Sequence, residues 1–145
     1  MKRIARFEKV SFGQFSDGWD DTFQAIEKGE NKDQSKETLK EIYDRIKLPR
    51  RATAGSAGYD FFAPVDIILN PGETIKIPTG IRVWMEPEWV LKCYPRSGLG
   101  FKFRLQLNNT VGIIDSDYFY SDNEGHIMVK ITNEGVKTMK VAKGD

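Results

Sequence analysis

The chain has 145 residues, a length typical of one domain, and its 22 basic and 21 acidic side chains leave a formal net charge of +1. This balance disfavours direct nucleic-acid binding, and no apolar run is long enough for a membrane span or a signal peptide, so we expect no membrane contact. The single cysteine, Cys93, excludes an internal disulfide framework and favours a reducing, cytoplasmic compartment. The single histidine, His126, disfavours a Cys/His metal site or a Ser-His-Asp triad.

The first 49 residues combine a strand-like opening with a helical region. The opening is "RIARFEKVSF", and residues 16–49 then carry apolar side chains at helical spacing. Ser35 is a candidate N-cap and Pro49 a stop. We expect a helical insert over about 16–49 that packs on the outside of the domain and offers a docking place for a protein partner. Its apolar stripe consists of Leu39, Ile42, Tyr43 and Ile46.

From residue 58 onward the hydrophobic period changes to two, which predicts strands. Turn residues such as "NPGE" punctuate the pattern. Many short strands with tight connections predict a mainly β fold, an antiparallel barrel or sandwich, in one domain over 1–145. The absence of β–α alternation disfavours Rossmann and P-loop architectures. The candidate strands are 59–63, 65–69, 74–77, 80–85, 89–94, 104–107, 110–114, 126–132 and 138–143.

Three glycine-bearing stretches interrupt the strand pattern: "AGSAGYDFFAP" (54–64), "YPRSGLG" (94–100) and "NNTVGIIDSDY" (108–118). Each alone is consistent with a linker, a loop or a solvated turn. Together they offer more specific chemistry. An Arg-Ser-Gly sequence combines a guanidinium, a hydroxyl and accessible backbone N–H groups, which suits phosphate oxygens. A narrow hairpin with asparagines can read a base edge, and an aspartate at its end can orient a water molecule.

In this order and spacing, the stretches resemble the first three motifs of the trimeric dUTPase (dUTP diphosphatase) family, and "KGD" at 143–145 resembles the start of the fourth. The resemblance covers roughly residues 50–145. It implies a jelly-roll β-barrel and a homotrimer with sites at subunit interfaces. It also implies Mg²⁺-dependent hydrolysis of dUTP to dUMP and pyrophosphate, which keeps uracil out of DNA and supplies dUMP for dTMP synthesis. The metal is expected on the substrate phosphates rather than on protein carboxylates.

The resemblance assigns a catalytic and a base-reading role to the third motif. Asp115 matches the residue that orients and deprotonates the attacking water. Tyr118 matches the aromatic ring that packs under the deoxyribose and leaves no room for a 2′-hydroxyl. The matches to the uracil-reading edge are Asn109, Gly112, Ile113 and Ile114.

The remaining matches concern the phosphates and the pocket wall. Arg96, Ser97 and Gly98 match the phosphate grip of the second motif. Asp60, in the first motif, is assigned a supporting role near the phosphates and the waters of the metal. Met128 is expected on the pocket wall, on the strand that returns from the hairpin.

Two departures from the family pattern stand out. The turn "FYSDNE" (119–124) separates Tyr118 from Gly125 and is longer than the family's one-residue spacing. The sequence also ends at Asp145, before the rest of the fourth motif and the glycine-rich fifth motif. A chain that ended there would be expected to keep the uracil pocket and to lose most turnover.

Three alternative functions remain open. One is dCTP deaminase, which shares the fold. Another is a non-catalytic dUTPase-like protein that binds a regulator, and the third is a fragment that binds nucleotide and turns it over poorly. Several side chains are expected to be structural: Asp117 as a turn residue, His126 at the surface or pocket rim, and Cys93 packed and unreactive.

Overall fold

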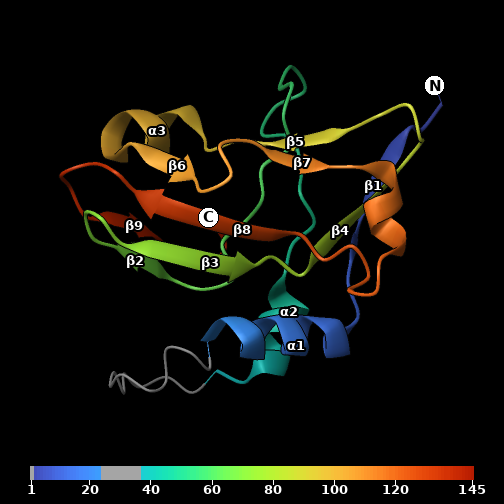
Figure 1. The fold of residues 1–145 in the computed structure, drawn as a ribbon, viewed down its shortest axis with the longest axis horizontal. Coiled ribbons are helices and arrows are strands. Elements are labelled where there is room, and N and C mark those ends of the chain that lie inside the picture. The colour runs from blue at the N-terminus through green and yellow to red at the C-terminus, as the bar shows by residue number, and fades with distance from the viewer. Residues whose placement is uncertain (1, 24–36) are drawn as a thin grey trace.

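The computed structural model describes residues 2–23 and 37–145, and within them antiparallel strands pair in four small sheets (Figure 1). The strands are β1 (Ala5–Lys9), β2 (Ile67–Leu69), β3 (Thr74–Pro78), β4 (Ile81–Met85), β5 (Leu91–Cys93), β6 (Leu105–Leu107), β7 (Gly112–Ile114), β8 (Met128–Asn133) and β9 (Met139–Val141). The helices are α1 (Phe12–Phe23), α2 (Leu39–Arg45), α3 (Ser97–Phe103) and the short 3-10 helix η1 (Ser116–Tyr120).

The pairings join segments that lie far apart in the sequence. Strand β1 pairs with β4, β2 pairs with β9, and β5 pairs with β7. Strand β8 lies between β3 and β6 in the sheet of three strands. Each pairing is antiparallel, as the short predicted strands and tight turns led us to expect.

Alternation along the strands builds the core. In β4, Ile81, Val83 and Met85 are buried, while the residues between them are half-buried. In β2, Ile67 and Leu69 point inward and Ile68 is exposed. Burial of these side chains supplies the main driving force for folding. The largest core cluster consists of Ile67, Leu69, Ile77, Leu105, Leu107, Ile131 and Met139.

The mainly β prediction is confirmed, and two local predictions are wrong. The segment 59–63 is not a strand, because only Asp60 pairs, in a single bridge with Arg50. The segment after Arg96 was interpreted as a loop and forms helix α3 instead. That helix ends at Arg104, whose left-handed backbone (φ 46°) turns its N–H back onto the carbonyl groups of Leu99 and Gly100.

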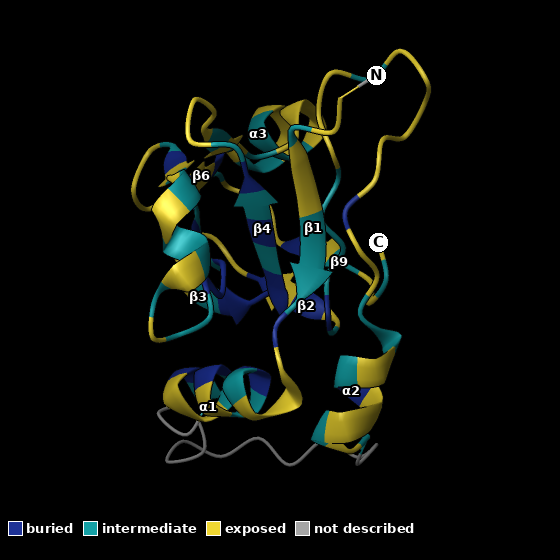
Figure 2. Ribbon diagram, turned by 90° about the vertical axis from the view of Figure 1, so that its right-hand side faces the viewer, coloured by how far each residue is buried: buried dark blue, intermediate teal, exposed yellow. Residues whose placement is uncertain are grey.

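The N-terminal helices lie together at one end of the strands (Figure 2). Helix α1 begins at Phe12, earlier than predicted, and α2 begins after Thr38, which forms a capping box with Glu41. The predicted cap Ser35 lies outside the described residues. The predicted stripe packs chiefly on α1, around buried Val10, Phe15 and Ile42. Neither α1, α2 nor α3 has the length and apolar character needed to cross a bilayer.

Candidate functional site

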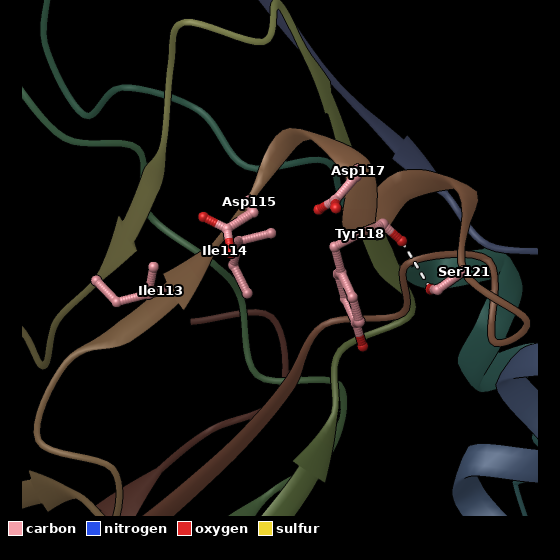
Figure 3. A pocket seen from close by; sticks show the side chains of 6 residues that line it. All are labelled: Ile113, Ile114, Asp115, Asp117, Tyr118 and Ser121. Atoms are coloured by element: carbon pink, nitrogen blue, oxygen red, sulfur yellow. Dashed lines mark hydrogen bonds between the residues drawn. The ribbon is translucent and has the colours of Figure 1, made fainter.

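A pocket of about 370 Å³ opens where β7 ends and η1 begins (Figure 3). Two carboxylates, a phenol ring and a hydroxyl meet apolar side chains there. This mixture suits a ligand with a planar or sugar-like body and polar edges. The lining residues are Ile113, Ile114, Asp115, Asp117, Tyr118 and Ser121.

The 3-10 helix explains why these side chains share one pocket. In such a helix, side chains three residues apart lie above one another. Asp115 is the N-cap of η1, Tyr118 lies within it, and Ser121 is its C-cap. The spacing of three therefore brings Asp115, Tyr118 and Ser121 to one side. Ser121 was not among the predicted site residues, and Asp117, predicted as a turn residue, also lines the pocket.

Tyr118 is held at the hydroxyl tip of its side chain and through its backbone carbonyl. Its hydroxyl donates to the His126 carbonyl oxygen at 2.7 Å and accepts from Asn123 Nδ2 at 2.9 Å. The Ser121 hydroxyl donates to the Tyr118 carbonyl oxygen at 2.7 Å. Because hydrogen bonds anchor the ring at its far tip, its flat face is kept beside Asp115 in the pocket wall.

The hairpin before β7 brings Asn109 close to the strand. Thr110 donates its N–H to the Leu107 carbonyl oxygen at 2.9 Å and has a left-handed backbone (φ 68°). Gly112 allows β7 to approach β5, since a Cβ there would lie 3.0 Å from Cys93 Cβ. The Asn109 amide lies over Gly112, outside the pocket lining. Burial raises the pKa of the Cys93 thiol, in keeping with the predicted unreactive cysteine.

The predicted phosphate grip forms a second group, apart from the pocket. Arg96 precedes α3 in extended conformation, and Ser97 and Gly98 form the first turn of that helix. The Arg96 guanidinium lies 3.7 Å from the Asp60 carboxylate, and its side chain is 71% exposed. The structure thus brings together Arg96 and Asp60, two residues that were predicted from different motifs to lie near the phosphates. Figure 1 shows α3 and the orange turn after β7 at opposite ends of the long axis.

Met128 and His126 do not lie where they were expected. Met128 is on β8, as predicted, but its terminal methyl group faces Gly18 on α1, and it does not line the pocket. His126 was expected at the surface or rim and is fully buried. That prediction was wrong because α1 covers the ring, with Phe15 and Gly18 against it. Burial lowers the pKa of His126 to about 4, against a smaller raising effect from Glu124.

Metal ligands are sparse around these side chains. Within residues 2–23 and 37–145, no three His, Cys, Asp or Glu side chains gather closely enough to hold an ion. The pocket itself contains two carboxylates, Asp115 and Asp117. Such oxygen donors suit a hard cation like Mg²⁺, which commonly keeps several waters and shares substrate phosphates as ligands.

Comparison with known proteins gives consistent matches. The family model described as dUTPase matches residues 44–145. The deoxyuridine 5′-triphosphate nucleotidohydrolase of Ectopseudomonas mendocina is 44% identical over 101 residues, covering 68% of this chain and 64% of that protein. The chain therefore spans less than two thirds of that relative's length. The family match over 44–145 includes all of the residues predicted to form the site.

Solved structures extend the comparison. The dUTPase of Streptococcus mutans is 36% identical, with a TM-score of 0.59 over 68% of this chain and 77% of that one. The match to a dUTPase of phage 80alpha covers 100% of this chain and 80% of the phage protein, with a TM-score of 0.60. At 18% identity the second likeness concerns the fold alone.

Proposed function

Since the chain belongs to the dUTPase family, we propose that it hydrolyses dUTP to dUMP and pyrophosphate. The observation that carries the proposal is the pairing of Asp115 with the anchored ring of Tyr118 in one pocket at the end of β7. A carboxylate beside a flat aromatic wall supplies a base next to a surface on which a deoxyribose can pack.

Asp115 acts as the general base in this proposal. Its carboxylate accepts the proton of a water whose oxygen attacks the α-phosphorus. The new bond forms as the bond from that phosphorus to the oxygen bridging the β-phosphorus breaks, and pyrophosphate leaves. Asp115 is exposed at the pocket and follows a strand end whose backbone is paired with β5. A carboxylate carried at the end of a paired strand is suited to proton abstraction.

Tyr118 and the hairpin account for the proposed specificity. The ring cannot swing away without breaking its hydrogen bonds to the His126 carbonyl and Asn123. A 2′-hydroxyl would therefore meet a fixed wall, which disfavours UTP. Asn109 and the backbone of Gly112 to Ile114 provide the proposed uracil-reading edge, where amide and peptide groups match the base's polar atoms.

The phosphate grip is proposed to meet this pocket across a subunit interface. Arg96 and Asp60 belong to one group and Asp115 to another, and neither Arg96 nor Asp60 is among the residues that line the pocket. A homotrimer with cyclic symmetry would let one subunit's Arg96 reach a neighbour's pocket. Apolar side chains exposed on and beside β5 and β7 support an interface there. They are Trp89, Val90, Tyr94 and Ile113.

Mg²⁺ is proposed to arrive with the triphosphate. When bound, it would neutralise charge on the phosphate oxygens. Asp115 and Asp117 would contact its waters, and Asp60 would orient Arg96 towards the same oxygens. We expect the reaction to take place in the cytoplasm, where precursors for DNA are made.

The test is product analysis on the protein expressed from its complete coding sequence. Pyrophosphate release from dUTP, with little from UTP or dCTP, is the expected result. Ammonia release from dCTP would instead indicate a deaminase, and tight dUTP binding without turnover would indicate a non-catalytic binding protein. Light scattering at micromolar concentration should give three times the chain mass, and a monomeric mass would contradict the proposed interface.

A further inference from the structure

The enlarged turn that follows Tyr118 lies directly against helix α1. Residues 119–126 complete η1, pass through a tight turn and lead towards β8, which begins at Met128. The turn is well formed: Gly125 donates to Ser121 Oγ at 3.1 Å, and Glu124 donates its N–H to the Ser121 carbonyl at 2.9 Å. Its outer side faces the first turn of α1, so the N-terminal helix and the pocket loop share an interface.

Glu124 makes the first contact across this interface. Its carboxylate accepts the Ser11 N–H at 2.9 Å and also the Ser11 hydroxyl. Ser11 Oγ in turn accepts the N–H of Gln14 at 3.2 Å, so Ser11 caps α1. In an ordinary capping box, the carboxylate that takes the cap's N–H comes from the third helical residue. Here it comes from the pocket turn, 113 residues later in the sequence.

Two properties of Glu124 indicate that this contact holds the turn's shape. Its backbone is left-handed (φ 59°), a conformation that non-glycine residues adopt at an energetic cost. The hydrogen bonds from Ser11 lower the pKa of its carboxyl, so the contact is formed by the charged group. A charge-assisted pair of this kind is stronger than a neutral hydrogen bond.

His126 makes the second contact. Its Nε2 accepts the N–H of Gly80 at 2.9 Å, and its Nδ1 lies 3.5 Å from the amide nitrogen of Gln14 on α1. A Cβ at Gly18 would lie 2.9 Å from His126 Cε1, so glycine allows α1 to approach the ring. The imidazole is therefore enclosed between α1 and the start of β4.

The same residue reaches the pocket through its backbone. The His126 carbonyl accepts the hydroxyl of Tyr118, whose ring lines the pocket beside Asp115. Asn123, next to Glu124, donates to the same hydroxyl. Of the two residues that anchor the tip of the ring, His126 itself contacts α1, and Asn123 precedes Glu124, which contacts the cap of α1.

We propose that helix α1 is part of the positioning apparatus of the substrate pocket, with Ser11, Glu124 and His126 as positioning residues that fix the ring of Tyr118 through the turn 119–126. The inference rests on the proposed function for its kinetic consequence. It also revises the expectation that the N-terminal helical region only packs on the outside of the domain.

The test compares Glu124→Asn with a matched control in the protein expressed from its complete coding sequence. Asparagine tolerates the left-handed backbone and is too short to reach Ser11. Glu124→Gln keeps the reach and one acceptor oxygen. Glu73→Ala is the control, because Glu73 also accepts a backbone N–H, from Asn70 at 2.7 Å, in the turn between β2 and β3. KM and kcat for dUTP and UTP, and amide hydrogen exchange over 116–126, are measured for each.

We expect Glu124→Asn to raise the KM for dUTP about tenfold, with a smaller change in kcat. The preference for dUTP over UTP should fall, and exchange over 116–126 should be faster. Glu124→Gln should show much smaller changes in KM, sugar preference and exchange than Glu124→Asn. Glu73→Ala should match the parent in all three. If Glu124→Asn failed to fold, Ser11→Ala, which removes one hydroxyl, should give the same pattern more weakly.

Two results would overturn the inference. One is a Glu124→Asn protein whose exchange and kinetics match those of Glu73→Ala. The other is faster exchange without any change in KM or sugar preference, since the turn would then be held by α1 without effect on the pocket. Failure of the proposed function is distinguishable, because the parent itself would then release no pyrophosphate from dUTP, while exchange would still report whether α1 holds the turn.

Discussion

The turn that carries Asp115 and Tyr118 and the loop that carries Arg96 differ in how firmly the chain holds them. Tyr118 has hydrogen bonds at its hydroxyl and its carbonyl, and its turn contacts α1 through Glu124. Arg96 has a long contact with Asp60 and is 71% exposed. A Cβ added to Gly98 would meet no atom within 4 Å.

This difference indicates which parts of the proposed site are preorganised before a ligand binds. The residues proposed to read the sugar and base are fixed within one chain, so little conformational entropy is lost when they bind. The residues proposed to grip phosphate are open and need a ligand or a neighbouring subunit to complete their contacts. Substitutions that break the contacts of Tyr118 or Glu124 should therefore affect stability and function together, and those in the second region should affect function alone.

The largest expected effect is that of Asp115→Asn. Loss of the base should lower kcat by about 10²–10⁴-fold, because general-base contributions have this size. Asp115 is exposed at the pocket, so stability and binding of a non-hydrolysable dUTP analogue should change little. Stopped or steady-state pyrophosphate release and calorimetric binding provide the two measurements. Parent-like turnover would exclude Asp115 as the base.

The fixed region should also respond to pH through His126. Its pKa is about 4 in the folded chain and near 6.5 when unfolded, so the unfolded state binds the proton more readily between these values. The free energy of unfolding should therefore fall as pH falls from about 6.5 to about 4, by up to about 3 kcal/mol at roughly 1.4 kcal/mol per pKa unit. Glu124, whose pKa is lowered, adds a loss in the same direction below about pH 4.5.

Urea unfolding followed by tryptophan fluorescence at a series of pH values would measure this slope. In His126→Gln the slope between pH 6.5 and 4 should be much flatter, because the titrating ring is gone. An unchanged slope in that variant would show that other groups cause the acid sensitivity.

Arg96→Ala tests the open region. We expect roughly a tenfold or greater rise in KM for dUTP, since a guanidinium facing phosphate contributes a charge-assisted hydrogen bond. The midpoint of urea unfolding should remain within the range of an ordinary surface substitution, because an exposed ion pair at 3.7 Å adds little stability. Arg96→Lys should retain the charge and recover part of the binding. A large loss of stability would contradict the contrast between the two regions.

Substitutions at Tyr118 separate the role of its ring from that of its hydroxyl. Tyr118→Phe should have the smallest effect of these variants. Tyr118→Phe keeps the flat ring and removes its hydrogen bond to the His126 carbonyl, so stability should fall by about 1 kcal/mol. The preference for dUTP over UTP should fall only in part, because the ring remains but is held less firmly. Tyr118→Ala removes the wall, and UTP should become a measurable substrate. Equal UTP-to-dUTP ratios in all three proteins would mean that another residue reads the sugar.

Local patterns were sufficient to predict most of the strands and the proposed chemistry. Period-two alternation in segments such as 80–85 reflects burial on one side of a strand, which is a property of consecutive residues. The same holds for the stripe of α2, whose spacing follows the helical turn. Asp115 and Tyr118 could be selected because the motif that carries them is continuous. Ser121 could also have been predicted as a pocket residue, since it follows Tyr118 by three residues, the repeat of a 3-10 helix.

Other features depended on the tertiary structure. His126 was expected at the surface or rim because it follows the enlarged turn, yet Phe15 and Gly18, more than 100 residues earlier, enclose it. The contact of Glu124 with Ser11 and the meeting of Arg96 with Asp60 likewise join distant segments. Burial and hydrogen bonding between such segments are decided by how strands and helices pack, and no periodicity within either segment encodes the partner. The sequence therefore determined which residues are proposed to carry the chemistry, and packing decided which of them are held in place.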